Sequence, residues 1–196
     1  ATTCEVFDFS KNAWRYVLPA SPYRIVDEQK PVYLDGSLYW LTECEETKVL
    51  SFDLHTETFQ VISKAPFPHS PNSNDVIMCI LDNRLCVSHK IWPTQSIWTS
   101  FDSLSGNGNK TWKKMWSIDL TKTFSLYGDT GLAPLVSPCL PLAILNENKL
   151  LLQGGDISQP VVIHDLHTKS YDLVFSTPTP GYTVSYFESL LSAFST

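Results

Sequence analysis

Aspartate side chains are the first candidates for acid–base chemistry in this sequence. They recur along the chain as Asp35, Asp53, Asp82, Asp102, Asp119 and Asp165. A pair of carboxyl groups can hydrolyse a glycosidic bond if the fold brings them to within about 5 to 10 Å of each other across a pocket. Most of these residues, however, stand where the chain is expected to turn, and aspartate is a common turn-capping residue. The sequence therefore favours a structural role for them.

Histidine, serine and cysteine residues give no stronger indication of catalysis. His55 and His167 occupy the same place in two copies of "DLHT", so a repeated turn position explains both. No GxSxG motif occurs, and "QGGD" at 153–156 lacks the Lys-Ser/Thr that completes a phosphate-binding loop. The five cysteines and five histidines do not cluster at metal-ligand spacing. We expect no catalytic, cofactor-binding or metal-binding residue.

The residues that do recur belong to a repeating pair of hairpins. Turn-forming residues stand between two apolar runs in "YLDGSLYWL" (33–41), "CILDNRLCV" (79–87) and "AILNENKLLL" (143–152). A second hairpin is predicted after each, in "LSFDLHTETFQVI" (50–62), "WTSFDSLSGNGNKTWKKM" (98–115) and "VIHDLHTKSYDLV" (162–174). An aromatic residue follows the aspartate by six positions in the first and third of these, and by ten in the second, where Ser105–Gly108 reads as an insertion.

The spacing of this repeat predicts the fold class. The aspartates of successive second hairpins, at 8, 53, 102 and 165, are 45, 49 and 63 residues apart. Units of roughly 40 to 50 residues with four short strands are typical of propeller blades. We therefore predict an all-β β-propeller, as a partial ring of four-stranded antiparallel blades. Because "VFDFSKNAWRYV" (6–17) matches only the second hairpin, we expect the chain to start in mid-repeat.

Charge and composition exclude several partners. Fourteen basic and twenty acidic residues give a formal charge of -6, and the basic residues are scattered, so nucleic acid is not expected. The sequence contains no run of about 18 apolar residues, the length needed to span a bilayer. Its first residues lack the charged and then apolar order of a signal peptide. An odd, unpatterned set of cysteines favours a reducing compartment. We expect a cytoplasmic protein, a nuclear protein or both, without membrane contact.

Aromatic residues are the best candidates for contact with a partner. The chain has six tryptophans, a residue type that is enriched in the hot spots of protein interfaces. Trp14 and Trp112, at the aromatic position of the repeat, are expected in the blade core. Trp92, Trp98 and Tyr127 are the predicted partner-binding residues. Tyr127 lies in 121–141, the longest departure from the repeat, and a long loop of this kind is commonly functional.

The ordered motifs resemble the F-box-associated, kelch-like interaction domain of plant F-box proteins. The resemblance rests on "KPVYLDGSLYWLT", "VLSFDLHTETFQVI", "SIWTSFD" followed by "TWKKMWSIDL", "PLAILNENKLLLQ", "VVIHDLHTKSYDLV" and the terminal "YFESLLS". It covers nearly the whole chain, so residues 1–196 are expected to be one such domain. It implies an upstream F-box, absent from these residues, that binds a Skp-type adaptor and cullin. The domain itself would select a target for ubiquitination and catalyse nothing.

Two other functions stay open at this point. One is an interaction protein that has no link to a ubiquitin ligase. The other is an enzyme on a propeller scaffold, either a glycosidase or an oxidase, which would need clustered carboxylates or metal ligands near the propeller axis. The sequence does not identify the target protein, nor the number of blades in the full-length protein.

Overall fold

The computed structural model describes residues 2–26, 29–67, 73–102, 110–121, 138–154 and 160–175. These residues form a two-stranded hairpin and three four-stranded antiparallel sheets in which strands follow in chain order. The hairpin is β1 (Glu5–Asp8) and β2 (Ala13–Tyr16). Blade 1 comprises β3 (Val32–Leu34), β4 (Ser37–Leu41), β5 (Lys48–Asp53) and β6 (Thr58–Lys64). After the short 3-10 helix η1 (Ser73–Asp75), blade 2 comprises β7 (Val76–Leu81), β8 (Arg84–Ile91), β9 (Thr94–Asp102) and β10 (Lys110–Asp119). Blade 3 comprises β11 (Leu140–Asn146), β12 (Lys149–Gln153), β13 (Val161–Asp165) and β14 (Tyr171–Phe175).

The first hairpin of each blade forms where the sequence predicts it. In blade 1 the turn residues Asp35 and Gly36 have φ angles of 47° and 77°, and in blade 2 Asp82 and Asn83 have 50° and 54°. Two successive residues with positive φ define the tight turn that matches the twist of the strands on either side. Aspartate, asparagine and glycine tolerate this conformation better than other residues. The turn residues therefore fix the register of the first two strands of each of these blades, which we call the inner strands; the third and fourth are the outer strands.

The second hairpins are held by an aspartate that caps the turn. The Asp53 carboxylate accepts hydrogen bonds from the backbone N–H groups of His55 and Thr56, at 2.8 and 2.7 Å. Asp165 does the same for His167 and Thr168, at 2.9 and 3.0 Å. In the β1–β2 hairpin, Asp8 accepts from Ser10 and Lys11 in the same way. The turn-capping role predicted for the repeated aspartates is confirmed at these positions.

The six-residue spacing between aspartate and aromatic reflects a ring pair across two strands. The residue before the aspartate faces the aromatic, as Phe52 faces Phe59 with ring centroids 4.7 Å apart. His164 and Tyr171 stack at 4.3 Å in blade 3, and Phe7 meets Trp14 at 5.3 Å in the N-terminal hairpin. Such rings pack well on a sheet surface.

Blade 2 departs from the expected alignment by one residue. Thr111, and not Trp112, is the partner of Phe101, which precedes Asp102. Since neighbouring residues of a strand point to opposite faces, Trp112 lies on the other face of its sheet. There its indole Nε1–H donates to Ser63 Oγ at 2.9 Å, joining the outer strands of blades 2 and 1. Trp112 thus packs between blades.

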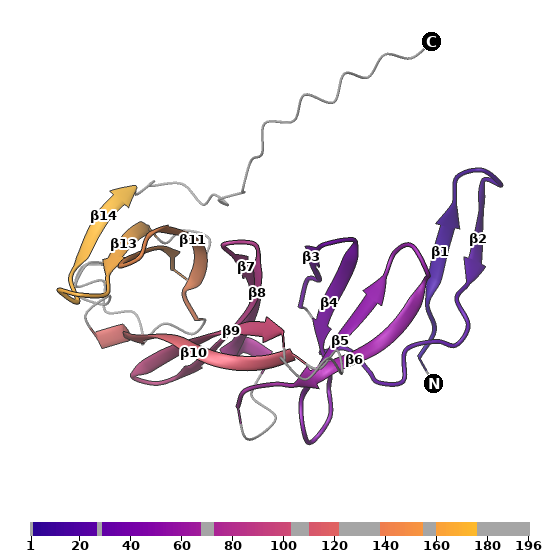
Figure 1. The fold of residues 1–196 in the computed structure, drawn as a ribbon, viewed down its shortest axis with the longest axis horizontal. Coiled ribbons are helices and arrows are strands. Elements are labelled where there is room, and N and C mark those ends of the chain that lie inside the picture. The colour runs from indigo at the N-terminus through magenta and orange to yellow at the C-terminus, as the bar shows by residue number, and fades with distance from the viewer. Residues whose placement is uncertain are drawn as a thin grey trace, which may run out of the picture.

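In the described part of the chain the core consists of two layers between adjacent blades, which are arranged along an arc (Figure 1). The layer between blades 1 and 2 contains Tyr39, Leu41, Val49, Leu85 and Val87 among its buried residues. The layer between blades 2 and 3 includes Cys79, Leu81, Cys86, Ile97, Trp116, Leu150 and Val162. Successive residues of β8 alternate between the two layers, because both faces of the central sheet are covered. The all-β fold of four-stranded antiparallel blades is therefore as predicted.

The expectation that Trp14 lies in a blade core is wrong. Its side chain is 67% exposed, although its ring contacts Phe7. The cause is that, among the described elements, β1 and β2 make their main contacts with each other, which leaves the Trp14 side chain uncovered. The terminal stretch "YFESLLS" lies outside the described residues.

Candidate partner-binding surface

The turns and connections of the blades divide between two ends of the molecule. In a four-stranded antiparallel meander, the turns from strand one to two and from three to four lie at one end. The turn from strand two to three and the connections between blades lie at the other, which we call the connection end. In this protein the connection end carries the β4–β5 turn (42–47), the β8–β9 turn (92–93) and the connections between β6 and β7 and between β10 and β11.

Trp92 lies at the connection end, in the β8–β9 turn. Its side chain is 46% exposed, and the neighbouring Ile91 is exposed as well. Trp92 is thus accessible to a partner, although its role in binding stays a prediction. A large rigid side chain next to a second apolar residue suits contact with another protein, since it gains much buried area at low entropic cost.

Both ends of the connection between β10 and β11 are fixed beside the Trp92 turn. At its start, the Leu120 N–H donates to the Pro93 carbonyl oxygen at 2.9 Å. At its other end, the Gln95 side chain bonds both backbone groups of Cys139. Residues 122–137, between these two contacts, are not described. The Leu120 and Cys139 contacts therefore place both ends of this segment next to the turn that contains Trp92.

Gln95 is a residue that the sequence analysis missed. It is fully buried, and its Oε1 accepts from the Cys139 N–H at 2.8 Å. Its Nε2 donates to the Cys139 carbonyl oxygen at 2.6 Å and to Ser88 Oγ at 2.7 Å. The sequence pattern of β9 could have identified it, because Gln95, Ile97 and Thr99 are every second residue of the strand and so lie on the same, buried face. A glutamine at a core position of a strand indicates a satisfied polar contact.

Trp98 and Tyr127 are not brought to Trp92 by any described contact. Trp98 lies in the middle of β9, half-buried, opposite Val87 on one side and Lys114 on the other. The Lys114 Nζ stands 5.8 Å from the Trp98 ring, a cation–π contact. Trp98 lies four positions along the strand from Thr94, the start of β9, which corresponds to about 13 Å. Tyr127 lies outside the described residues.

Charged residues surround the β4–β5 turn at the same end of the molecule. Glu43 forms an ion pair with Arg24 at 3.4 Å, and Glu46 forms one with Lys64 at 2.7 Å. The Lys64 contact lowers the pKa of the Glu46 carboxyl below its ordinary value. All four side chains are largely exposed, so these pairs contribute little to stability.

The predicted carboxylates and histidines do not form a catalytic cluster among the described residues. No group of three or more His, Cys, Asp or Glu side chains in this part of the chain could hold a metal ion. His55 and His167 are exposed in their turns. Asp119 accepts hydrogen bonds from the backbone and hydroxyl of Thr121, at 3.0 and 2.6 Å, and so caps the end of β10. The side chain of Asp102 is outside the description.

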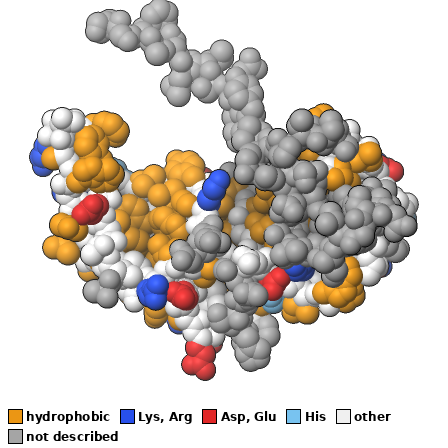
Figure 2. Space-filling view, turned by 180° about the vertical axis from the view of Figure 1, so that it is seen from behind, with side chains coloured by type: hydrophobic (Ala, Val, Ile, Leu, Met, Phe, Trp, Pro, Cys, Tyr) orange, Lys and Arg blue, Asp and Glu red, His pale blue; other side chains and the backbone are white. Residues whose placement is uncertain are grey.

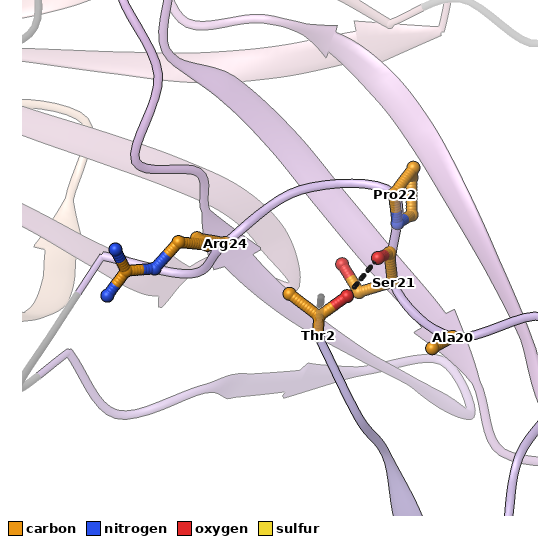
Figure 3. A pocket seen from close by; sticks show the side chains of 5 residues that line it. All are labelled: Thr2, Ala20, Ser21, Pro22 and Arg24. Atoms are coloured by element: carbon orange, nitrogen blue, oxygen red, sulfur yellow. Dashed lines mark hydrogen bonds between the residues drawn. The ribbon is translucent and has the colours of Figure 1, made fainter.

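A hollow of about 770 Å³ with a mixed polar and apolar lining opens between the N-terminal residues and the connection that follows β2 (Figure 3). Thr2, Ser21 and Arg24 contribute to its lining. The Thr2 hydroxyl donates to the Ser21 carbonyl oxygen, while the guanidinium of Arg24 extends away from that pair. This lining offers neither a nucleophile with an adjacent base nor a pair of carboxylates.

Buried thiols are also unsuited to catalysis. Cys79 and Cys86 face each other across β7 and β8, and Cys139 lies in the same core layer. Burial raises the pKa of Cys79 well above its ordinary value and that of Cys139 to about 12. A nucleophilic cysteine requires the opposite shift, because the thiolate is the reactive form.

No helix of the described residues is long and apolar enough to cross a membrane.

Comparison with known proteins gives the family. An F-box/LRR-repeat/kelch-repeat protein of Arabidopsis thaliana is 56% identical over 98% of this chain and 49% of its own length. An F-box protein of the same species is 53% identical over 98% of the chain and 48% of its own length. The chain thus spans about half the length of the curated relatives it matches. Residues 1–192 match the F-box associated beta propeller domain, and the chain belongs to this plant F-box protein family.

Proposed function

We propose that this chain is the substrate-recognition module of a cullin-based, SCF-type E3 ubiquitin ligase. In this proposal residues 1–196 act as one F-box-associated β-propeller domain. An F-box elsewhere in the full-length protein binds a Skp-type adaptor, through which cullin is recruited. The observation that carries the proposal is membership of the F-box associated family, together with relatives that are named F-box proteins. The chain acts by binding, and ubiquitin transfer takes place on other subunits.

The connection end is the surface that we assign to the target protein. Loops on a rigid β scaffold are the usual site of recognition, because their sequence can vary without disturbing the core. Here the argument rests on Trp92, which is exposed beside Ile91 and beside both fixed ends of the β10–β11 connection. Truncating a tryptophan at the centre of an interface typically costs about 2 kcal/mol or more, which weakens binding about 30-fold.

A co-purification experiment tests both parts of the proposal. The tagged full-length protein is purified from plant cells as wild type, as Trp92→Ala and as Leu145→Ala. Leu145 is a matched control, since it is 48% exposed against 46% for Trp92 but lies beside the β11–β12 turn, at the opposite end. We expect adaptor and cullin with all three forms, and a further protein that is depleted only by Trp92→Ala.

The outcomes separate the proposed function from its alternatives. Absence of adaptor and cullin from all three preparations would contradict the ligase assignment and leave an interaction protein of another kind. Equal recovery of the target with Trp92→Ala and Leu145→Ala would place recognition elsewhere on the domain.

The proposal also includes a compartment. Ubiquitin ligases of this type act in the cytoplasm and nucleus, and we place the protein in one or both. All five cysteines are free thiols, and three of them are buried, an arrangement that suits a reducing compartment. Imaging of a fluorescent fusion in plant cells tests this, and accumulation in a secretory compartment would contradict it.

A further inference from the structure

The β1–β2 hairpin corresponds to the outer half of a blade. Its Asp8 cap and its Phe7–Trp14 ring pair match Asp53 and the Phe52–Phe59 pair of blade 1. β1 therefore takes the place of a third strand. In each of the three complete blades the third strand pairs on its inner side with the second strand, whereas among the described strands β1 pairs with β2 alone.

The register identifies the backbone groups of β1 that face the edge with which no described strand pairs. The Val17 N–H donates to the Cys4 carbonyl oxygen at 2.9 Å, so Cys4, and by alternation Val6, direct their backbone groups toward β2. The residues that alternate with Cys4 and Val6 direct their backbone N–H and C=O groups to the opposite edge of the strand. The N–H and C=O groups of Glu5 and Phe7 consequently point away from β2. An edge of this kind is a template for another strand.

A largely apolar cavity of about 500 Å³ lies between the start of β1, the connection that follows β2 and blade 1. Five consecutive residues, 2–6, line it. The cavity therefore extends from the residues that precede β1 to its first two residues, Glu5 and Val6. Its other wall is blade 1, with Leu38, Trp40 and Phe59. Figure 2 shows the hollow with hydrophobic side chains beside the β1–β2 hairpin, on the left of that view.

Blade 3 shows how the corresponding face is covered in a complete pair of blades. Leu150 of β12 faces His164, the residue before the capping aspartate, just as Leu38 of β4 faces Phe52. Leu150 and Leu152 therefore correspond to Leu38 and Trp40. Both leucines are fully buried, with 0% exposure. In blade 1 Leu38 and Trp40 are only half-buried.

The core layer that covers this face of blade 3 contains residues from all four strands of the preceding blade, its first and second strands among them. Cys79 and Leu81 of β7 and Cys86 of β8 belong to the same core layer as Leu150 and Leu152. These are the two strands that the β1–β2 half-blade lacks in the described structure. A first and a second strand in these places would therefore add the apolar residues that the corresponding layer beside blade 1 lacks among the described residues.

We propose that a β-hairpin from an earlier part of the full-length polypeptide fills this cavity and pairs with the free edge of β1. Its second strand accepts and donates hydrogen bonds at Glu5 and Phe7, and its inward side chains are small and medium apolar residues, as on β7 and β8. Two facts favour the same polypeptide as the source. Residues 2–4 line the cavity, and the relatives are about twice as long as this chain. The inference does not depend on the ligase assignment.

Hydrogen exchange of the full-length protein, resolved at single amides, tests the inference. The amides of Val6 and Asp8 bond to β2 and serve as the internal reference. We expect Glu5 and Phe7 to be protected to within about tenfold of these two amides, because an unpaired strand edge exchanges far faster than a paired one. Leu38→Lys places a charge in the cavity and is expected to lower protection of Glu5 and Phe7 at least tenfold.

A control variant and the concentration of protein complete the design. Leu145→Lys makes the same change at an exposed position outside the cavity and should leave Glu5 and Phe7 protected. Rapid exchange of these two amides in the wild type, with Val6 and Asp8 protected, would overturn the proposal. Protection that disappears on dilution would also overturn it, because a second copy would then be the occupant. A full reading frame without residues ahead of position 1 would have the same effect.

Discussion

Replacing Gln95 by methionine tests how blades 2 and 3 are joined beside the Trp92 turn. Gln95 is fully buried and makes hydrogen bonds to both backbone groups of Cys139 and to the Ser88 hydroxyl. Methionine has a similar length and volume but no strong donor or acceptor, so Gln95→Met keeps the packing and removes the hydrogen bonds.

The magnitude follows from the groups that lose their partner. The N–H and C=O of Cys139 would both be buried without a hydrogen bond, at a cost of about 1 to 3 kcal/mol each. Burying a thioether in place of an amide offsets about 1 kcal/mol of this loss. We expect the free energy of unfolding to fall by about 3 kcal/mol.

Urea unfolding of the full-length protein, followed by tryptophan fluorescence, measures this change. Gln60→Met is the matched control, because it is the same substitution at an exposed position of β6. The control should change stability by no more than about 0.5 kcal/mol. If Gln95→Met and Gln60→Met unfolded at the same urea concentration, the reasoning about the Gln95–Cys139 contact would be refuted.

Four further changes have defined outcomes. Trp112→Phe removes the indole hydrogen bond to Ser63 and should lower the free energy of unfolding by about 1 kcal/mol in the same urea assay, with Ser63→Ala giving a similar loss. Backbone hydrogen bonds lower the pKa of the Asp53 carboxyl, so its stabilisation is present above the unfolded value of 3.8 and is lost as the pH falls through the lower folded pKa. Asp53→Asn should weaken this acid dependence in an acid titration followed by circular dichroism. Burial lowers the pKa of His89 from 6.5, so stability should decrease as the pH falls below 6.5, and His89→Leu should remove that decrease from thermal melts measured between pH 5 and 7. Burial raises the pKa of Cys139 to about 12, so the stability that is complete below pH 9 should be lost progressively between pH 9 and 12, and Cys139→Ala should flatten that range; an unchanged alkaline profile would contradict the burial argument.

The repeat was predictable because its turns depend on local chemistry. Asp35 and Gly36 suit a turn with two positive φ angles, and Asp53 and Asp165 cap the second hairpin through their own neighbouring N–H groups. Such interactions involve residues within a few positions of each other, so the sequence carries them directly. The blades and their order follow from these turns.

The environment of individual side chains was harder to predict, because it depends on which sheet covers which face. Trp14 has the same local pattern as Phe59 but is exposed, since among the described elements β1 and β2 make their main contacts with each other. Trp112 differs by one residue of register from the repeat, which changes the face on which it lies. Gln95 bonds to Cys139, 44 positions along the chain, and nothing in the local sequence names that partner.

The candidate binding surface was predictable only in part. The proline after Trp92 and the polar residues around it indicate a turn, and hence an accessible side chain. That both ends of the β10–β11 connection are fixed beside this turn is a tertiary feature, which depends on the contacts of Pro93 and Gln95. Trp98, in contrast, is half-buried within β9, where it lies between Val87 and Lys114 of the neighbouring strands.

The most direct test of the receptor function is the lifetime of the co-purified target protein in plant cells. Its half-life is measured after protein synthesis is stopped, in cells that express the full-length protein as wild type, Trp92→Ala or Leu145→Ala. The proposal predicts that the wild type and Leu145→Ala shorten the half-life, that a proteasome inhibitor reverses this, and that Trp92→Ala leaves the target long-lived. A target whose half-life is the same with and without the wild-type protein would contradict the function as a substrate receptor.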